Sequence, residues 1–193
     1  NIYDECVKAG SPDLPIIFTS TSKITFPGAG VAVEAASPNN VALLKGRMKY
    51  QTIGPDKLNQ LRHARMFRTV EDIEKHMKRH AAILRPKFET VEKELQNQLS
   101  GTGIARWTTP RGGYFISLYV LEGCAKRVEQ LCANAGMILT PAGATYPYGN
   151  PKDSNIRIAP SYPSVEEIEK ASEVLALAVR YAALEKLLAD KEN

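Results

Sequence analysis

Apolar residues recur every three or four positions between residues 70 and 100, a spacing that predicts one long amphipathic helix. The apolar stripe consists of Val70, Ile73, Met77, Ala81, Leu84, Phe88, Val91, Leu95 and Leu99. Thr69 offers a hydroxyl that caps the helix, and Gly101 and Gly103 are expected to end it. Because Pro86 lies inside the stripe and lacks a backbone donor, we expect a kink there.

Shorter helices and strands alternate on both sides of the long helix. Before it, the pattern predicts a buried strand at 15–19, a second strand at 31–36, and helices at 38–49 and 55–68. After it, the pattern predicts hairpin strands at 104–109 and 114–120, a helix at 124–135, strands at 137–140 and 155–160, and a helix at 164–188. Ser164 and Glu167 have the spacing of a capping box at the start of the last helix. This alternation predicts an α/β fold.

Composition and charge narrow the classes of function. The 193 residues are 44% hydrophobic and 24% charged, and the net charge of +4 comes from interleaved acidic and basic residues. Such a surface favours neither nucleic acid nor a membrane as partner, and no apolar run approaches the roughly 20 residues of a membrane span. The sequence has no visible secretory signal, and its three cysteines have no metal-type spacing, so we expect reduced thiols in a cytoplasmic protein.

His76 and His80 form an i, i+4 pair of the kind that can chelate a metal ion. Both lie off the apolar stripe, among Lys and Arg residues, and no third ligand is evident. We therefore expect the two histidines to lie on a solvated face, and we expect no metal site.

A lysine flanked by hydroxyls is the first candidate for chemistry. Lys23 follows Ser20, Thr21 and Ser22, after an apolar run and before the glycine-rich turn at 26–30. A lysine that forms a Schiff base needs a rigid support, partial desolvation and hydroxyl donors for an anionic cofactor. An ordinary loop lysine in a Ser/Thr-rich turn would explain the same residues, so the local sequence leaves both interpretations open.

Two other motif interpretations of this segment fail. Ser20 and Lys23 match the S-x-x-K pattern of penicillin-recognising acyl transferases, which requires a helix and a downstream K-T-G strand. Pro27 and two glycines follow Lys23 at once, and the chain contains no K-T-G. A P-loop is also excluded, because no glycine precedes Lys23 at the right distance.

The second candidate is Arg157, which lies between Ile156 and Ile158 in a strand-like run. Strand alternation places the two isoleucines on one face and the guanidinium on the other. A guanidinium in such a place needs an anionic partner, and its planar fork suits a carboxylate. A structural ion pair with a glutamate would also satisfy it, so the residue alone does not decide between structure and function.

Several motifs occur together in an order that resembles the fold-type I aminotransferases dependent on pyridoxal 5′-phosphate (PLP). They are Ser20-Thr21-Ser22-Lys23, Phe26-Pro27-Gly28, Pro110-Arg111-Gly112-Gly113-Tyr114-Phe115, Pro141-Ala142-Gly143 and Asn155-Ile156-Arg157-Ile158-Ala159. The set spans essentially the whole chain and is most similar to a bacterial class I-like subgroup that includes aspartate aminotransferases.

The resemblance implies roles for individual residues. Lys23 would be the Schiff-base lysine and the proton carrier, and Ser20, with Ser22 as a second donor, would bind the cofactor phosphate. Arg157 would bind the substrate α-carboxylate. Many relatives carry Arg or Lys seven or eight residues after the lysine, where this chain has Gly30 and Val31, so the phosphate charge would be met elsewhere.

The resemblance also implies the domain organisation, because members of this family are about twice as long. The chain would be the C-terminal half, with the end of the large PLP-binding domain at 1–69, a long connecting helix at 70–100 and a smaller α+β domain at 101–193. The whole protein would be a homodimer that transfers an amino group, by a ping-pong mechanism, between an amino acid, aspartate in our prediction, and a 2-oxo acid such as 2-oxoglutarate. We expect the chain to be inactive without the N-terminal half. The alternative is an aminotransferase-like regulatory or structural domain without turnover, as in transcription factors that fuse a DNA-binding module to such a body.

Overall fold

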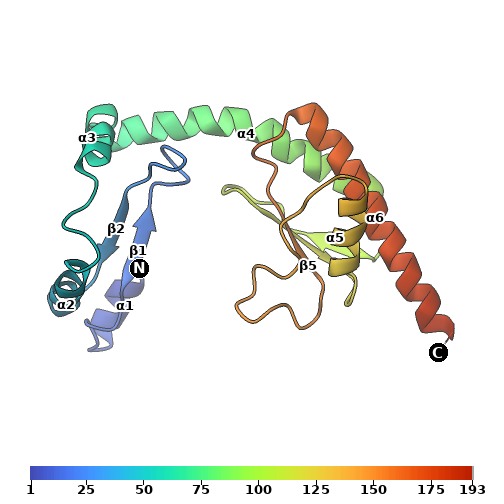
Figure 1. The fold of residues 1–193 in the computed structure, drawn as a ribbon, viewed down its shortest axis with the longest axis horizontal. Helices are drawn as coiled ribbons and strands as arrows, with labels where there is room; N and C mark the ends of the chain where they lie inside the picture. The colour runs from blue at the N-terminus through green and yellow to red at the C-terminus, as the bar shows by residue number, and fades with distance from the viewer. Residues whose placement is uncertain (193) are drawn as a thin grey trace. The chain divides into compact units, whose positions relative to one another are not determined.

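The computed structural model describes residues 1–192, which form two compact units, Asn1–His80 and the residues from Ala81 onward (Figure 1). Helices and strands alternate along the chain, as expected for the predicted α/β class. Each unit is described by itself.

The first unit contains a two-stranded antiparallel sheet and short helices. Its elements are α1 (Ile2–Lys8), β1 (Ile17–Ser20), β2 (Ala32–Ala35), α2 (Pro38–Met48), α3 (Lys57–Met66) and the first turns of α4 (Val70–Leu99). Strands β1 and β2 pair with Ile17 opposite Ala35 and Ser20 opposite Ala32. Helix α1 is additional to the predicted elements; the Asn1 side chain caps it by accepting a hydrogen bond from the Tyr3 amide.

The prediction that the strand before Lys23 is buried is wrong for this chain. In β1 only Ile17 is half-buried, and the Phe18 side chain is 72% exposed. A two-stranded sheet has no neighbouring strands and needs another layer to cover its faces. Strand β1 therefore has the apolar composition of a buried strand, but no described residues of its unit cover it.

Helix α4 forms at the predicted bounds and runs through Pro86 as one helix. The Thr69 hydroxyl accepts from the Asp72 amide at 3.4 Å, and Asp72 in turn accepts from the Thr69 amide at 3.2 Å, which confirms the predicted cap. The apolar stripe is buried only at its C-terminal end, at Val91, Leu95 and Leu99. Periodicity identifies the apolar face of a helix, but burial also requires a partner for that face.

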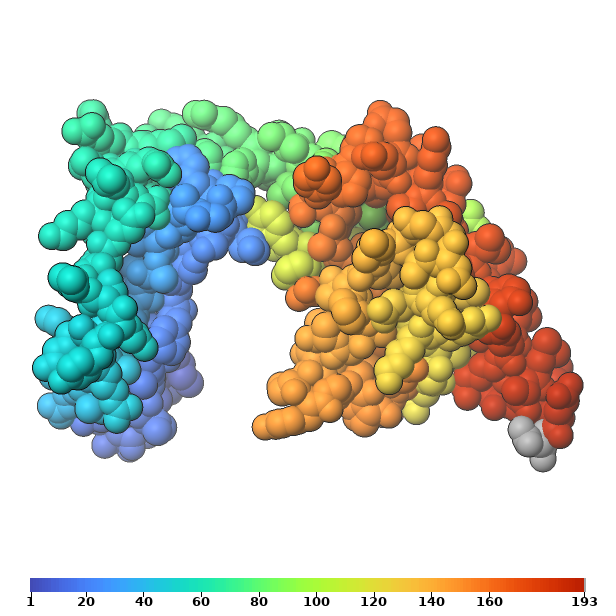
Figure 2. All heavy atoms as spheres, viewed as in Figure 1, coloured from blue at the N-terminus to red at the C-terminus, as the bar shows by residue number. Residues whose placement is uncertain are grey.

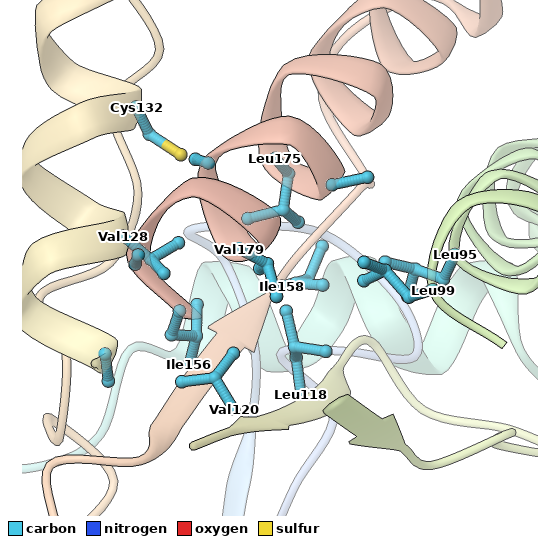
Figure 3. Close-up of a cluster of buried hydrophobic side chains, with 14 of the residues drawn as sticks. Leu95, Leu99, Leu118, Val120, Val128, Cys132, Ile156, Ile158, Leu175 and Val179 are labelled. Carbon is cyan, nitrogen blue, oxygen red and sulfur yellow. The ribbon is translucent and has the colours of Figure 1, made fainter. Parts of the chain in front are cut away.

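The second unit is built on a three-stranded antiparallel sheet in the order β3-β4-β5. Its elements beyond α4 are β3 (Ala105–Trp107), β4 (Ile116–Val120), α5 (Ala125–Asn134), β5 (Asn155–Ile158) and α6 (Val165–Glu192). Side chains from α4, β4, β5, α5 and α6 meet in one apolar core, as Figure 3 shows for Leu95, Leu118, Ile156, Val128 and Val179. The predicted capping box is present at α6: the Ser164 amide donates to Glu167 at 2.8 Å, and the Glu167 amide donates to Ser164 Oγ at 3.2 Å.

The predicted strand at 137–140 does not form. Helix α5 ends at Asn134 with Ala135 as its C-cap, Gly136 adopts a φ of +85°, and the Met137 amide donates back to the Cys132 carbonyl at 2.9 Å. That bond closes the helix end and takes the donor that a strand ladder would need. The following loop at 141–153 projects at the surface of this unit (orange in Figure 2).

The three cysteines are free thiols, as predicted. Within residues 1–192, no helix combines the length and apolar character that crossing a bilayer requires. The same residues contain no group of three or more His, Cys, Asp or Glu side chains arranged for a metal ion.

Candidate functional site

The segment that carries Lys23 is a compact turn directly after β1. Ser20 Oγ and Ser22 Oγ lie 2.6 Å apart, and the Ser22 amide donates to Ser20 Oγ at 3.1 Å. Of the two hydroxyl hydrogens, one joins the pair and the other remains available to an outside acceptor. The structure thus brings Ser20 and Ser22 together beside Lys23, which is the arrangement that an anionic group needs.

Thr21 and Thr25 hold this turn in place through hydrogen bonds. The Thr21 amide donates to the Val31 carbonyl at 2.9 Å, and the Val31 amide donates to Thr21 Oγ1 at 2.8 Å. The Thr25 amide donates to the Thr21 carbonyl at 2.8 Å, and Thr25 is only 3% exposed. The backbone on both sides of Lys23 is therefore tied down, although the turn lies between two short strands.

Gly30 explains why no basic residue stands seven residues after Lys23. A Cβ built at Gly30 would lie 2.9 Å from both the backbone nitrogen and the Cα of Ser22, and it would collide with Ser22 Oγ. Backbone atoms cannot move aside as a flexible side chain can, so this conformation admits only glycine seven residues after Lys23. The Asn59 side chain also holds this position, because Nδ2 donates to the Gly30 carbonyl at 3.1 Å.

Lys23 itself is exposed in this chain. The expectation that the Lys23 side chain is partly desolvated is therefore wrong within the described residues of this chain. The turn fixes the lysine backbone, but the described residues of its unit do not enclose the side chain.

The expectation of a solvated pair at His76 and His80 is also wrong. Both residues are half-buried, and their rings lie 4.3 Å apart. His76 Nε2 donates to the Thr25 carbonyl at 3.2 Å, and its ring contacts Phe67 at 5.2 Å between centroids. Burial, and next the neighbouring His76, lower the pKa of His80.

The third histidine of the chain, His63, joins the same cluster and was not singled out from the sequence. Its Nε2 lies 2.8 Å from Thr25 Oγ1, and its Nδ1 lies 2.9 Å from the Asn59 carbonyl oxygen. Its ring meets Phe26 edge-on at 5.2 Å. His63 and Thr25 are 38 residues apart, so no local spacing reveals this contact.

The second unit contains Arg157, on β5. Ile156 and Ile158 point into the core, and Arg157 lies on the other face of the strand, as alternation predicted. The guanidinium carbon lies 4.6 Å from the centre of the Phe115 ring, in a cation–π contact. Its Nε is buried and has no hydrogen-bond partner among the described residues.

The ion pairs found in residues 1–192 do not include Arg157. They join Lys8 to Glu5, Arg127 to Glu185, Lys152 to Glu122 and Lys186 to Asp190. The alternative of a structural pair with a glutamate is therefore wrong. A buried guanidinium donor without an acceptor requires an explanation, and an anionic ligand is the chemical group that would satisfy it.

A buried amide network lies beside Arg157, and no local sequence pattern indicated it. The Asn155 side chain accepts from Thr145 Oγ1 at 2.9 Å and donates to Ser117 Oγ at 2.8 Å. Ser117 is the residue opposite Arg157 in the β4–β5 register. The network ties the loop at 141–153 to the strands next to the guanidinium.

Comparison with known proteins identifies what this chain is similar to. The model of the family described as aspartate amino-transferase matches residues 1–191. A putative aminotransferase of Mycolicibacterium smegmatis is 46% identical over 184 residues, which are 95% of this chain and 43% of that protein. An aspartate aminotransferase of Corynebacterium glutamicum is 47% identical over 178 residues, 92% of this chain and 41% of that protein.

Solved structures agree with these matches. The crystal structure of a putative aminotransferase from Corynebacterium diphtheriae aligns with a TM-score of 0.91 and 45% identity, over 96% of this chain and 46% of that one. The α-aminoadipate aminotransferase LysN from Thermus thermophilus, solved with N-(5′-phosphopyridoxyl)-L-leucine, aligns with a TM-score of 0.77 at 20% identity, over 95% of this chain and 46% of that one. This last likeness shows the fold alone. The chain spans less than half the length of the relatives it matches.

Proposed function

This chain belongs to the aspartate aminotransferase family, and on that premise we propose that it carries the cofactor lysine and the substrate-binding arginine of a PLP-dependent aminotransferase. Lys23 is the cofactor lysine, with Ser20 and Ser22 as donors to the cofactor phosphate, and Arg157 binds the substrate α-carboxylate. The observation that carries the proposal is the Ser20–Ser22 hydroxyl pair, 2.6 Å apart and held beside Lys23 by a closed turn.

The residues of the turn fit this cofactor. A phosphate needs hydrogen-bond donors, and the serine pair has a hydroxyl hydrogen to give. A Cβ at position 30 would collide with Ser22. Because Gly30 has none, the serine pair keeps its place in the turn. Because this chain has Gly30 and Val31 where many relatives carry a basic residue, the charge of the phosphate is met by groups outside the turn.

When bound, PLP supplies an electron sink that stabilises negative charge at the substrate Cα. The Lys23 amine would hold the cofactor covalently at rest and, once displaced by the amino group of the substrate, would carry the proton between the substrate Cα and the cofactor. The tied backbone at Thr21 and Thr25 limits the positions that the Lys23 amine can reach. Such restraint matters because general acid–base catalysis depends on hydrogen-bond reach between the base and the proton.

Arg157 orients the amino acid. Its planar fork donates two parallel hydrogen bonds to a carboxylate, and the Nε that lacks a partner among the described residues is one of the two donors. The Phe115 ring under the guanidinium stabilises the charge and restricts the fork to one plane. A lysine at this position would keep the charge and lose the bidentate geometry.

The whole protein is proposed to be a homodimeric cytoplasmic enzyme. Residues 1–69 belong to the large PLP-binding domain, residues 70–100 form the connecting helix and residues 101–193 form the small domain. The exposed apolar side chains of β1 and β2, such as Phe18 and Val33, are covered by the rest of the large domain. Aspartate as amino donor and 2-oxoglutarate as acceptor are the proposed substrates in a ping-pong reaction, a choice supported by the name of the Corynebacterium glutamicum relative.

The test of the cofactor lysine uses the full-length protein. Incubation with PLP, reduction with borohydride and peptide mapping should place the modification on Lys23. The variant Lys23→Ala should lose both the modification and transamination. Lys8→Ala is the matched control, because Lys8 is an exposed lysine of the same unit whose partner is Glu5. Modification of another lysine, with Lys23 unlabelled, would overturn the assignment.

Arg157 is tested by a substitution that keeps its charge. In Arg157→Lys the KM for the amino acid should rise about tenfold or more, because charge-assisted hydrogen bonds contribute roughly 1.5–3 kcal/mol each. Binding of PLP should stay unchanged. Full-length protein that takes up PLP at Lys23 but converts none of the common amino acids would instead support the regulatory alternative.

The purified 193-residue chain offers a separate test. We propose that it does not transaminate by itself, because Lys23 is exposed and the phosphate charge is not balanced within the turn. Pyridoxal absorbance together with turnover in this chain, lost in Lys23→Ala, would show that the proposal about the missing half is wrong.

A further inference from the structure

We propose that His63 is a positioning residue for Lys23, and that it acts by accepting a hydrogen bond from the Thr25 hydroxyl. The inference rests on the proposed function of Lys23. The contact joins α3 to the turn that carries the lysine, through a distance of 2.8 Å between His63 Nε2 and Thr25 Oγ1.

The direction of this hydrogen bond follows from the other ring nitrogen. His63 Nδ1 lies 2.9 Å from the Asn59 carbonyl oxygen, which only accepts, so Nδ1 carries a hydrogen. In the neutral ring Nε2 is then an acceptor, and the Thr25 hydroxyl donates to it. The α-helical backbone of α3 thus selects the tautomer through Asn59, one turn before His63.

The Thr25 hydroxyl has one hydrogen and three acceptors within reach. His63 Nε2 is nearest at 2.8 Å, followed by Thr21 Oγ1 at 3.0 Å and the Thr21 carbonyl at 3.2 Å. Without His63 the hydrogen can turn to Thr21, so no buried donor is left without a partner. The loss of His63 therefore removes its contacts with Thr25 and, at 3.4 Å, with Thr21 Oγ1, and leaves the bond from Asn59 to the Gly30 carbonyl as a link between α3 and this region.

The contact between His63 and Thr25 sets the backbone around Lys23 because Thr21 and Thr25 lie two residues before and two residues after it. The Ile24 and Thr25 amides both donate to the Thr21 carbonyl at 2.8 Å. Thr25 is held a second time by His76 Nε2, which donates to its carbonyl at 3.2 Å. Two helices, α3 and α4, therefore each hydrogen-bond to one buried threonine, which lies two residues after Lys23.

The competing explanation is that His63 only fills space against Phe26 and Phe67, whose ring centroids lie 5.2 and 6.1 Å away. Three substitutions separate these roles in the full-length protein. His63→Leu keeps most of the apolar volume and removes the acceptor. His63→Gln retains a side-chain oxygen that can accept from Thr25. Thr25→Val removes the donor with little change of shape.

His80→Leu is the matched control. His80 belongs to the same ring cluster, 4.3 Å from His76, and it makes no hydrogen bond to the turn within the described residues. It therefore reports the effect of losing an imidazole from the cluster without losing the link to Thr25.

The first measurement is the rate at which PLP added to the apoprotein is captured by borohydride on Lys23. We expect His63→Leu and Thr25→Val each to slow capture about tenfold, since small misplacements of a reacting group cost one to two orders of magnitude. The double variant should be no slower than either single variant, His63→Gln should recover most of the rate, and His80→Leu should leave it unchanged. Equal slowing by His63→Leu and His80→Leu, or no recovery in His63→Gln with an unchanged melting temperature, would overturn the inference.

The second measurement does not depend on the cofactor. Amide hydrogen exchange at Ile24 and Thr25 in the apoprotein should be faster in His63→Leu than in His63→Gln, by about fivefold, the loss expected for one neutral hydrogen bond of roughly 1 kcal/mol. If the wild type fails to bind PLP at Lys23, the proposed function fails, and exchange at these two amides still decides the role of His63. Unchanged exchange in His63→Leu would show that His63 does not hold the turn.

Discussion

Glycine 30 shows how one residue without a side chain shapes the candidate site. The backbone nitrogen and Cα of Ser22 occupy the space in which a Cβ at position 30 would lie. The φ of Gly30 is not in the left-handed region, so close approach, rather than backbone conformation, requires glycine here. A small substitution at this position should therefore disturb the serine pair directly.

We expect Gly30→Ala to weaken PLP binding to the full-length protein and to destabilise it by about 1–3 kcal/mol, the usual cost of overpacking. Binding is measured by titration with PLP, and stability by urea unfolding. Gly46→Ala is the control, because Gly46 lies inside α2 with open space around its Cβ position; it should stabilise the protein by about 0.5–1 kcal/mol. Equal or tighter PLP binding in Gly30→Ala would contradict the steric explanation.

The cysteines provide a second prediction at this scale. Burial raises the pKa of the Cys132 thiol to about 11, and burial is also the main cause that raises the pKa of Cys124. At pH 8 about one Cys132 thiol in a thousand would then be ionised, and the thiolate is the reactive form. In the 193-residue chain, alkylation at pH 8 followed by mass spectrometry should label Cys6 first, and Cys124 and Cys132 only after unfolding. Rapid labelling of Cys132 in the native protein would contradict its burial.

Among the elements, the two long helices differ in what supports them. Helix α6 begins at a reciprocal capping box and contributes Leu175, Val179 and other residues to the core. Helix α4 has the same type of apolar periodicity, but only its last turns are buried. Capping and propensity start a helix, whereas packing of its apolar face supplies most of its stability.

Loss of the α6 cap should be measurable in the 193-residue chain. Ser164→Ala removes the acceptor of the Glu167 amide, and we expect it to lower the free energy of unfolding by about 1 kcal/mol. The measurement is urea unfolding followed by circular dichroism. Ser161→Ala lies three residues earlier and is the control, since the Ser161 hydroxyl makes none of the hydrogen bonds found in the described residues; its effect should be within about 0.5 kcal/mol of zero. Equal effects of the two substitutions would argue against the cap.

In the whole molecule, the buried apolar residues are concentrated in the second unit. All the buried hydrophobic side chains among the described residues lie at Val91 or beyond, whereas the buried residues of the first unit are Thr25 and Ser37. The first unit is therefore organised by hydrogen bonds and the ring cluster around Thr25. Such a unit has little apolar burial to resist local opening.

Hydrogen exchange of the 193-residue chain should reveal this difference. We expect strong protection in β4, β5 and the middle of α6, and weak protection in β1 and β2. Leu95→Ala, at a fully buried position, should lower the stability of the second unit by about 2–5 kcal/mol. Ile83→Ala on the same helix is the control, because Ile83 is 63% exposed. In the full-length protein β1 and β2 should become protected; weak protection there would contradict the proposal that the remaining half covers them.

Patterns that depend on near neighbours were predictable from the sequence. Thr69 and Ser164 start their helices, and the alternation at Ile156, Arg157 and Ile158 assigns each to a face of β5. The set of motifs around Lys23 and Arg157 indicated the family, and the comparisons confirm it. These features follow from the fixed periods of helices and strands and from short spacings, so no tertiary information is needed.

Features that depend on distant segments were decided only by the tertiary structure. The contact of His63 with Thr25 spans 38 residues, and the space at Gly30 is filled by Ser22. The apolar segment at 137–140 has the composition of a strand, but its first amide is used by the end of α5. By itself, the sequence predicted most of the helices and strands, and it singled out the side chains that are candidates for chemistry. The tertiary structure decided which of those side chains are held and covered, because packing partners come from elsewhere in the chain.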